Sequence, residues 1–156
     1  MRLVFWVGFW TFLLDQVTKY VVVHAMDLAN LGRIDVWPPL INLRMAWNYG
    51  INFGLFSGPS ETVKWVLIAV ALTISGAVLW WVHREAMTRR QKIAAGLLVG
   101  GALGNVVDRL LYGAVADFLN MSCCGFDNPY AFNLADIAVF AGALGLVIFT
   151  PNKKPA

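Results

Sequence analysis

Residues 65–82 form an apolar run without a single charged side chain. A helix that crosses a membrane needs about 20 predominantly apolar residues, each adding about 1.5 Å. Further apolar stretches of similar length lie elsewhere in the chain, so the sequence predicts four membrane spans at about 3–26, 63–82, 93–112 and 132–150. The predicted fold class is an all-α membrane protein, built as a single integral membrane domain over residues 1–156.

Composition supports a membrane protein. Hydrophobic residues make up 59% of the chain and charged residues 13%, whereas typical soluble domains carry about 25% charged residues. This composition excludes intrinsic disorder and argues against a small soluble enzyme, which could not bury so much apolar surface. The net charge of +3 does not indicate a nucleic-acid partner, because the basic residues cluster at the ends of the apolar segments.

The first apolar stretch shares features with a cleaved secretory signal peptide. Arg2 precedes it, and the tripeptide at 23–25 loosely resembles a cleavage site. However, a polar cluster from Asp15 to Lys19 lies where such a peptide is apolar or small. We therefore interpret residues 3–26 as a retained helix.

Basic residues in the short connections predict the orientation of the spans. The connection at 83–92 holds four basic residues, and the ends of the chain add Arg2, Lys153 and Lys154. Both termini are therefore predicted to be cytoplasmic, and segments 27–64 and 113–130 are predicted to lie outside.

The external segment between the first two spans is predicted to hold a small strand or helix element. Gly32, Pro38 and Pro39 interrupt residues 27–39, so this part is not one helix. Residues 40–56 are apolar and aromatic with polar residues interspersed, which suits either strands or an interfacial helix. Periodicity does not decide between the two.

Acidic residues fall inside three of the predicted spans at similar depth. Counted from the cytoplasmic ends, Asp15 lies about 18 Å deep, Asp108 about 22 Å and Asp136 about 21 Å. Asp117 follows Asp108 closely enough to fold back to the same level. Each buried charge costs at least about 2.5 kcal/mol in a membrane, so these acids indicate either a functional site or paired structural charges.

Some of these acids have a structural interpretation. Asp15 and Lys19 are four residues apart on one helical face, which is typical of an ion pair that holds a bundle together. Asp108 and the adjacent Arg109 can each pair with another helix, and Asn105 shares the helical face of Asp108.

Asp117 and Asp136 differ from the others because neither has a basic residue within four positions. Should both point to one water-accessible spot, they share a proton, since two close carboxylates do not easily both ionise. One then activates a water while the other polarises a carbonyl, which is the chemistry of aspartic peptidases.

The glycines and cysteines do not indicate a functional site. Gly100 and Gly104 form a small-residue pair that favours close helix packing. Cys123 and Cys124 are adjacent and lack metal-ligand spacing, so they are interpreted as incidental. The sequence has no CxxC motif and no Cys/His spacing typical of a metal site.

Five motifs, taken in order, resemble the lipoprotein signal peptidase family, also called signal peptidase II, which comprises bacterial inner-membrane aspartyl peptidases. The resemblance covers almost the whole chain. The motifs are LDQVTK at 14–19, NYGINFG at 48–54, GGALGNVVDRL at 100–110, VADF at 115–118 and FNLAD at 132–136.

The resemblance implies a role for each polar position. Asp117 and Asp136 match the catalytic dyad of the family. Asp15 and Lys19 match positions tied to the integrity of the fold, and Asp108 matches a supporting polar position. The positions that line the site, bind the substrate or orient the dyad are Asn48, Gly50, Asn105, Arg109 and Asn133.

The resemblance also implies a substrate and a location. The family hydrolyses the peptide bond before a cysteine that already carries diacylglycerol, which releases the signal peptide of a prolipoprotein. The expected partners are such prolipoproteins and membrane lipids, with no nucleic acid, and the resemblance implies neither a metal nor an organic cofactor. The expected protein is a monomer in the inner membrane, with its active site toward the periplasm and a small sheet and helix at the membrane surface.

Two features depart from the family pattern. Asn52 stands where the family usually has alanine, and the loop at 120–130 carries Cys123 and Cys124. Two other functions remain as alternatives: a transport protein using its acids as a relay, and a non-catalytic membrane subunit. The common depth of the acids argues against a relay, which needs acids at several depths.

Overall fold

The computed structural model describes residues 1–50, 60–125 and 127–150. The departure at Asn52 and the rest of the motif after Gly50 therefore lie outside the described residues.

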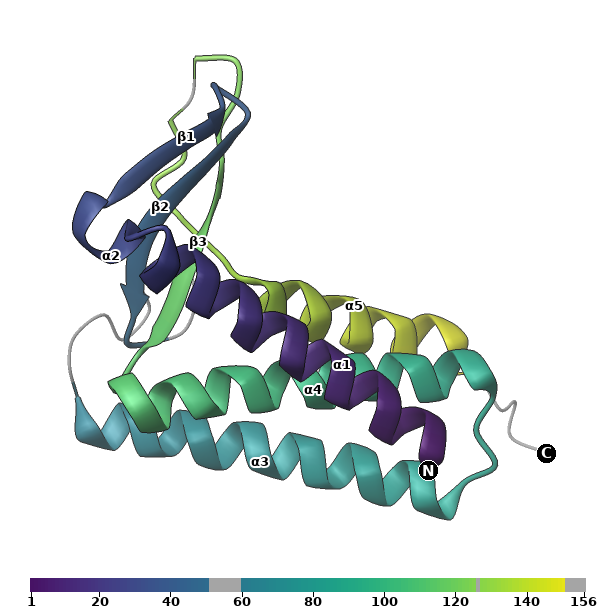
Figure 1. Ribbon diagram of the computed structural model, residues 1–156. Coiled ribbons are helices and arrows are strands. Elements are labelled where there is room, and N and C mark those ends of the chain that lie inside the picture. Colours follow the sequence, from purple (N-terminus) through teal and green to yellow (C-terminus); the bar gives the residue numbers. More distant parts are fainter. Residues whose placement is uncertain (51–59, 126, 151–156) are drawn as a thin grey trace.

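Long helices form the body of the protein, and α4 lies at their centre (Figure 1). α4 contacts each of the other long helices. These helices are α1 (Arg2–Lys19), which continues as the π-helix η1 (Tyr20–Ala25), α3 (Glu61–Arg84), α4 (Arg89–Tyr112) and α5 (Leu134–Phe149). A short helix, α2 (Leu28–Leu31), follows η1.

Two of these helices, α3 and α4, are long and apolar enough to cross a membrane. α5 is apolar but shorter, and α1 carries three charged residues along its length. The predicted spans at 63–82 and 93–112 are thus supported by length and composition. The spans at 3–26 and 132–150, and with them the count of four, stay predictions.

The connection between α3 and α4 is shorter than predicted. α4 begins at Arg89 rather than at residue 93, because Thr88 and Gln91 form a capping box at its N-terminus. The backbone N–H of Thr88 donates to Gln91 Oε1 at 2.8 Å, and the N–H of Gln91 donates to Thr88 Oγ1 at 3.3 Å. Most basic residues of the predicted loop therefore lie on the first turn of α4.

A three-stranded antiparallel sheet stands at one end of the helices (Figure 1). Its order is β1 (Arg33–Trp37), β2 (Ile41–Asn48) and β3 (Val115–Met121). Strand β2 decides between the two alternatives for residues 41–48 in favour of a strand. The predicted element between the first two spans is present as α2, β1 and β2, and the sheet gains a third strand, β3, from the segment between α4 and α5.

The third strand, β3, is formed by a sharp turn after α4 and by pairing with β2. Gly113 ends α4 with φ at +76°, a conformation that favours glycine. The chain then reverses into β3, where Ala46 of β2 pairs with Asp117. β3 is a strand because it pairs with β2, which lies far away in the sequence. The local pattern of residues 113–130 therefore did not predict it.

An apolar cluster fixes the sheet against the end of α1. Val23 of η1, Leu28 of α2, Leu43 of β2 and Phe118 of β3 pack together with Ala116. Because Ala116 and Phe118 flank Asp117, this cluster determines where that carboxyl lies.

Small residues let α4 approach its neighbours, as the glycine spacing predicts. A Cβ on Gly100 would lie 2.5 Å from the carbonyl oxygen of Gly8 on α1. A Cβ on Gly101 would lie 2.5 Å from the carbonyl oxygen of Ala135 on α5. At Gly104, a Cβ would overlap the carboxylate of Asp15.

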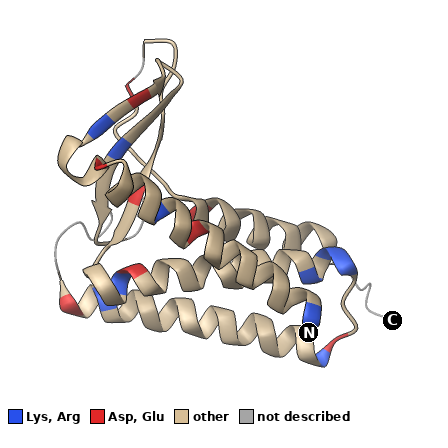
Figure 2. Cartoon of the chain, in the orientation of Figure 1, with Lys and Arg blue, Asp and Glu red and all other residues tan. Residues whose placement is uncertain are grey.

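Basic residues gather at the end of the helices opposite the sheet, where the N-terminus and the α3–α4 connection lie (Figure 2). Arg2 begins α1, Arg84 ends α3, and Arg89, Arg90 and Lys92 stand on the first turn of α4.

We expect Gly104→Leu to lower the yield of folded protein and the thermal midpoint in detergent. The side chain would displace Asp15, and overpacking alone costs about 1–3 kcal/mol. The matched control is Gly76→Leu on α3, because a Cβ there meets nothing within 4 Å. A thermal midpoint for Gly104→Leu equal to that of Gly76→Leu would contradict this account of the packing.

Candidate active site

Asp117 lies on β3 with a side chain that is almost fully buried. Two amide groups donate to its carboxyl oxygens. Nδ2 of Asn133 lies 2.6 Å from Oδ1, and Nδ2 of Asn48 lies 3.0 Å from Oδ2. Asn48 ends β2 and Asn133 precedes α5, so three elements meet at this carboxyl.

Asp136 stands in the first turn of α5, three residues after Asn133. The two residues form a capping box: the N–H of Asp136 donates to Asn133 Oδ1 at 2.9 Å, and the N–H of Asn133 donates to Asp136 Oδ2 at 3.3 Å. Nδ2 of Asn105 donates to the other carboxyl oxygen of Asp136 at 2.9 Å.

Asn133 therefore joins the two acids. Its oxygen caps α5 beside Asp136, while its amide nitrogen donates to Asp117. Asparagine suits this capping position because its side chain has both an acceptor for the helix N–H and an N–H donor for the carboxyl of Asp117. An aspartate could cap the helix but could not donate. Asp117 and Asp136 are thus both in hydrogen-bond contact with one side chain.

Arg109 completes the site from α4. Its Nη2 donates to the carbonyl oxygen of Gly50 at 3.0 Å, and its Nη1 donates to the carbonyl oxygen of Asn105 at 3.4 Å. The N–H of Gly50 in turn donates to Asn48 Oδ1 at 3.2 Å. Arg109 thus holds the chain that follows β2 beside the two acids.

The surroundings of Asp117 change its acidity. Burial, followed by the neighbouring negative charge of Asp136, raises the pKa of Asp117 to about 7. The amide donors and the charge of Lys19 act in the opposite direction without cancelling this effect. The carboxyl is therefore set to carry a proton near neutral pH, as a shared proton between two acids requires.

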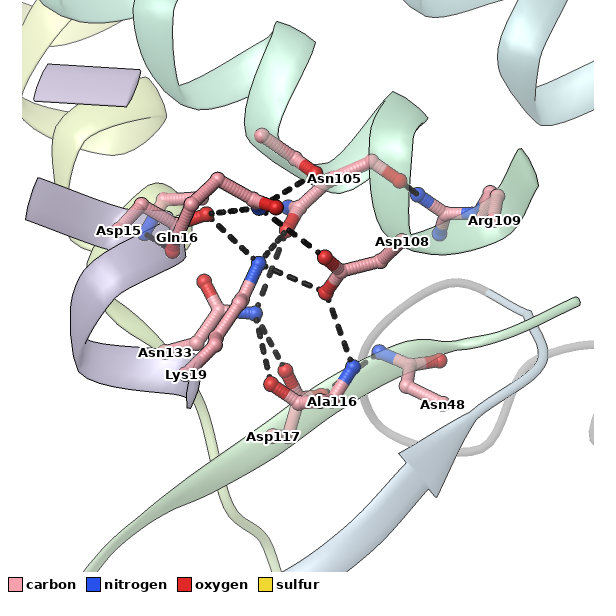
Figure 3. A network of polar contacts seen from close by, with 12 residues as sticks. Asp15, Gln16, Lys19, Asn48, Asn105, Asp108, Arg109, Ala116, Asp117 and Asn133 are labelled. Atoms are coloured by element: carbon pink, nitrogen blue, oxygen red, sulfur yellow. Dashed lines mark hydrogen bonds and ion pairs between the residues drawn. The ribbon is translucent and has the colours of Figure 1, made fainter. Parts of the chain in front are cut away.

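A second group of charges lies next to Asp117 (Figure 3). Lys19 Nζ lies 2.8 Å from Asp15 Oδ2 and 2.8 Å from Asp108 Oδ2. The predicted pair of Asp15 and Lys19 is confirmed. Asp108 shares the same lysine, which fits the structural interpretation of its charge.

Gln16 belongs to this group, although the sequence analysis gave it no role. Its Nε2 donates to Asp15 Oδ2 and to Asp108 Oδ1, each at 3.1 Å. The sequence did indicate a role for Gln16, because a polar amide inside an apolar stretch needs a hydrogen-bond partner when it is buried. Cys123 and Cys124, by contrast, are exposed and free.

Comparison with known proteins identifies a family. The family described as signal peptidase (SPase) II matches residues 7–151. The chain belongs to this family.

Named relatives of the family cover most of the chain. The lipoprotein signal peptidase of Methylobacterium sp. (strain 4-46) is 39% identical over 140 residues, which are 90% of this chain and 83% of that protein. The one from Rhodopseudomonas palustris (strain ATCC BAA-98 / CGA009) is 39% identical over 152 residues, which are 96% of this chain and 92% of that protein.

A solved structure shares the fold. A bacterial membrane enzyme determined by the in meso method at 2.3 Å resolution superimposes with a TM-score of 0.81 at 28% identity, covering 100% of this chain and 94% of that one. Membership of the signal peptidase II family makes this chain a bacterial membrane peptidase, and it favours an enzyme over the transport protein and the non-catalytic subunit.

The raised pKa of Asp117 predicts a pH-dependent stability. The folded protein favours the protonated carboxyl, so this contribution is present at acid pH and is lost as the pH rises through about 7. We expect the thermal midpoint in detergent to fall between about pH 4, where the carboxyl of an unfolded chain ionises, and about pH 7, and to level off above that pH. Asp117→Asn should flatten that fall.

The control for this experiment is Asp35→Asn on β1, whose side chain is half exposed. It should keep the pH dependence of the wild type. A pH dependence in Asp117→Asn as steep as in the wild type would show that other groups are responsible.

Proposed function

We propose that this chain is an aspartic endopeptidase that removes signal peptides from diacylglyceryl-modified prolipoproteins and cleaves before the lipidated cysteine. Membership of the signal peptidase II family supports the processing of lipoprotein signal peptides. The observation that carries the aspartic mechanism is the contact of both Asp117 and Asp136 with Asn133. The raised pKa of Asp117 is consistent with a pair that holds one proton.

In the proposed reaction the pair of Asp117 and Asp136 acts as one unit. The ionised carboxyl takes a proton from a water, whose oxygen attacks the scissile carbonyl carbon. The protonated carboxyl donates to the carbonyl oxygen, so a neutral tetrahedral intermediate forms. When the intermediate breaks down, the amine of the lipidated cysteine leaves with a proton, and the signal peptide leaves as a carboxylic acid. The position of the resting proton belongs to the pair rather than to either residue.

The surrounding amides keep the two acids in place. Asn48 and Asn133 donate to Asp117, and Asn105 donates to Asp136. Each of these amides restricts rotation of a carboxyl, and a correct angle of attack is worth several kcal/mol in catalysis. We assign Asn48, Asn105 and Asn133 to orienting the dyad.

Arg109 and Gly50 are assigned to substrate binding. Arg109 stays charged at any working pH, and its buried Nε finds no acceptor among the described residues. A backbone carbonyl of the substrate would satisfy this donor. Gly50 supplies a carbonyl oxygen that accepts from Nη2 and so fixes the guanidinium.

The proposed location follows from the arrangement of charges. The basic end of the bundle faces the cytoplasm under the positive-inside rule, and the dyad lies at the other end, beside the sheet. A cysteine anchored by diacylglycerol holds its peptide bond near the outer surface of the inner membrane. The proposed single domain, with four spans and cytoplasmic termini, places the dyad at that level.

The proposal predicts the behaviour of the dyad variants. Purified wild type should cleave a synthetic diacylglyceryl-modified prolipoprotein, whereas Asp117→Asn and Asp136→Asn should each lose at least about 1,000-fold in kcat while remaining folded, because proton transfer contributes about 100- to 10,000-fold and the pair acts together. Asp35→Asn, on the outer strand β1, serves as the matched control and should cleave normally. Normal cleavage by either dyad variant would exclude the assigned mechanism.

The proposed orientation can be tested with thiols. Cys123 and Cys124 are exposed beyond β3, so a membrane-impermeant maleimide added to intact spheroplasts should label them. In a chain with Cys123→Ser and Cys124→Ser, a cysteine introduced by Glu85→Cys in the α3–α4 connection should react only after permeabilisation. Labelling of the position 85 thiol in intact spheroplasts would reverse the orientation.

A further inference from the structure

Lys19 occupies the centre of the polar contacts in Figure 3. Its ammonium group contacts three acceptors: Asp15 Oδ2 and Asp108 Oδ2, each at 2.8 Å, and Asn105 Oδ1 at 3.2 Å. An ammonium group has three N–H donors, so these contacts use its full capacity. Lys19 is 6% exposed and the two carboxylates 0% and 1%, so water competes little for these groups.

Each of the two carboxylates also accepts a backbone N–H. Oδ1 of Asp15 accepts the N–H of Ala135 at 3.0 Å. Oδ2 of Asp108 accepts the N–H of Ala116 at 3.2 Å. Ala135 directly precedes Asp136, and Ala116 directly precedes Asp117. The two buried carboxylates therefore hold the backbone at the residue before each acid of the dyad.

The third contact of Lys19 sets the orientation of an amide. An ammonium group can only donate, so Asn105 must turn its oxygen toward Lys19. Its nitrogen then faces the other way and donates to Asp136 at 2.9 Å. Nδ2 of Asn133 donates to the same Asn105 oxygen at 3.3 Å. Lys19 and Asn133 together therefore keep the Asn105 amide from turning its oxygen toward the carboxylate of Asp136.

We propose that Lys19 is the positioning residue of the dyad: it holds Asp15, Asp108 and Asn105 in one geometry, and through them it aligns Asp117 with Asp136. This inference rests on the proposed function and extends it. Lys19 donates to neither acid of the dyad in the described contacts, so it is not a catalytic residue. Its role goes beyond the stability of the fold. Asn105 connects Lys19 directly to Asp136, and the two carboxylates connect it to the backbone of the residue before each acid.

Gln16 makes the arrangement rigid. It donates to both carboxylates and, at 3.4 Å, to the carbonyl oxygen of Gly104. Asp15 and Asp108 are thus connected twice, once by the ammonium group and once by the amide. A small change in the lysine head group would therefore be transmitted to the backbone of β3 and of α5 rather than absorbed locally.

The test uses a substitution that keeps the charge and changes only the geometry. Lys19→Met would leave two buried carboxylates unpaired and endanger folding, since breaking a buried ion pair costs about 3–5 kcal/mol. Lys19→Arg retains the positive charge, but a planar guanidinium cannot direct three donors from one nitrogen atom to these acceptors. The matched control is Lys92→Arg at the cytoplasmic end of α4.

The measurements are kcat and KM for a synthetic diacylglyceryl-modified prolipoprotein, with thermal midpoints of the full-length proteins in detergent. For Lys19→Arg we expect a folded protein, a KM within about twofold of the wild type and a kcat about 100-fold lower, since a misplacement of about 1 Å has an effect of that order. Lys92→Arg should match the wild type in all three quantities.

Two results would overturn the inference. A kcat for Lys19→Arg within about twofold of the wild type would show that the dyad does not need this geometry. Failure of Lys19→Arg to fold, while Lys92→Arg folds, would assign Lys19 to the stability of the bundle alone. Failure of the proposed function is a separate outcome, since it would appear as undiminished cleavage by Asp117→Asn.

Discussion

A charged lysine inside a helical bundle has to be paired there, because neither lipid nor the apolar packing around it offers a substitute for water. Lys19 meets this requirement with two carboxylates, one from α1 and one from α4. The same carboxylates accept backbone N–H groups from β3 and α5. One set of buried charges thus fixes how four elements meet, and the two acids assigned to catalysis lie on the elements that it holds.

Packing and charge depend on each other in this arrangement. Gly104 leaves room for the Asp15 carboxylate against α4, so a small residue is needed for a polar contact rather than for helix contact alone. Gly101 lets the backbone of Ala135 approach α4, and Ala135 donates to Asp15. The close approach of the helices and the pairing of the buried charges therefore depend on each other.

The candidate active site combines contacts between residues near in the sequence with contacts between distant ones. Asn133 caps α5 beside Asp136, which is a local event within four residues. The same side chain reaches Asp117 on a strand that forms only by pairing with β2, whose residues lie far away in the sequence. The pKa of Asp117 is raised because burial in the sheet and the negative charge of Asp136 on α5 act on the same carboxyl.

The sequence by itself determined the membrane character, the two helices that are long and apolar enough to cross a membrane, and the ion pair of Asp15 and Lys19, because apolar length and helical spacing are local properties. Its motifs also pointed to the signal peptidase II family, which the relatives confirm. Only the tertiary structure decided that β3 completes the sheet, that Asp108 shares Lys19, and that Gln16 and Ala116 belong to the polar contacts around the dyad. Strand pairing and buried hydrogen bonds join residues that are distant in the chain, so no local pattern of residue types records them.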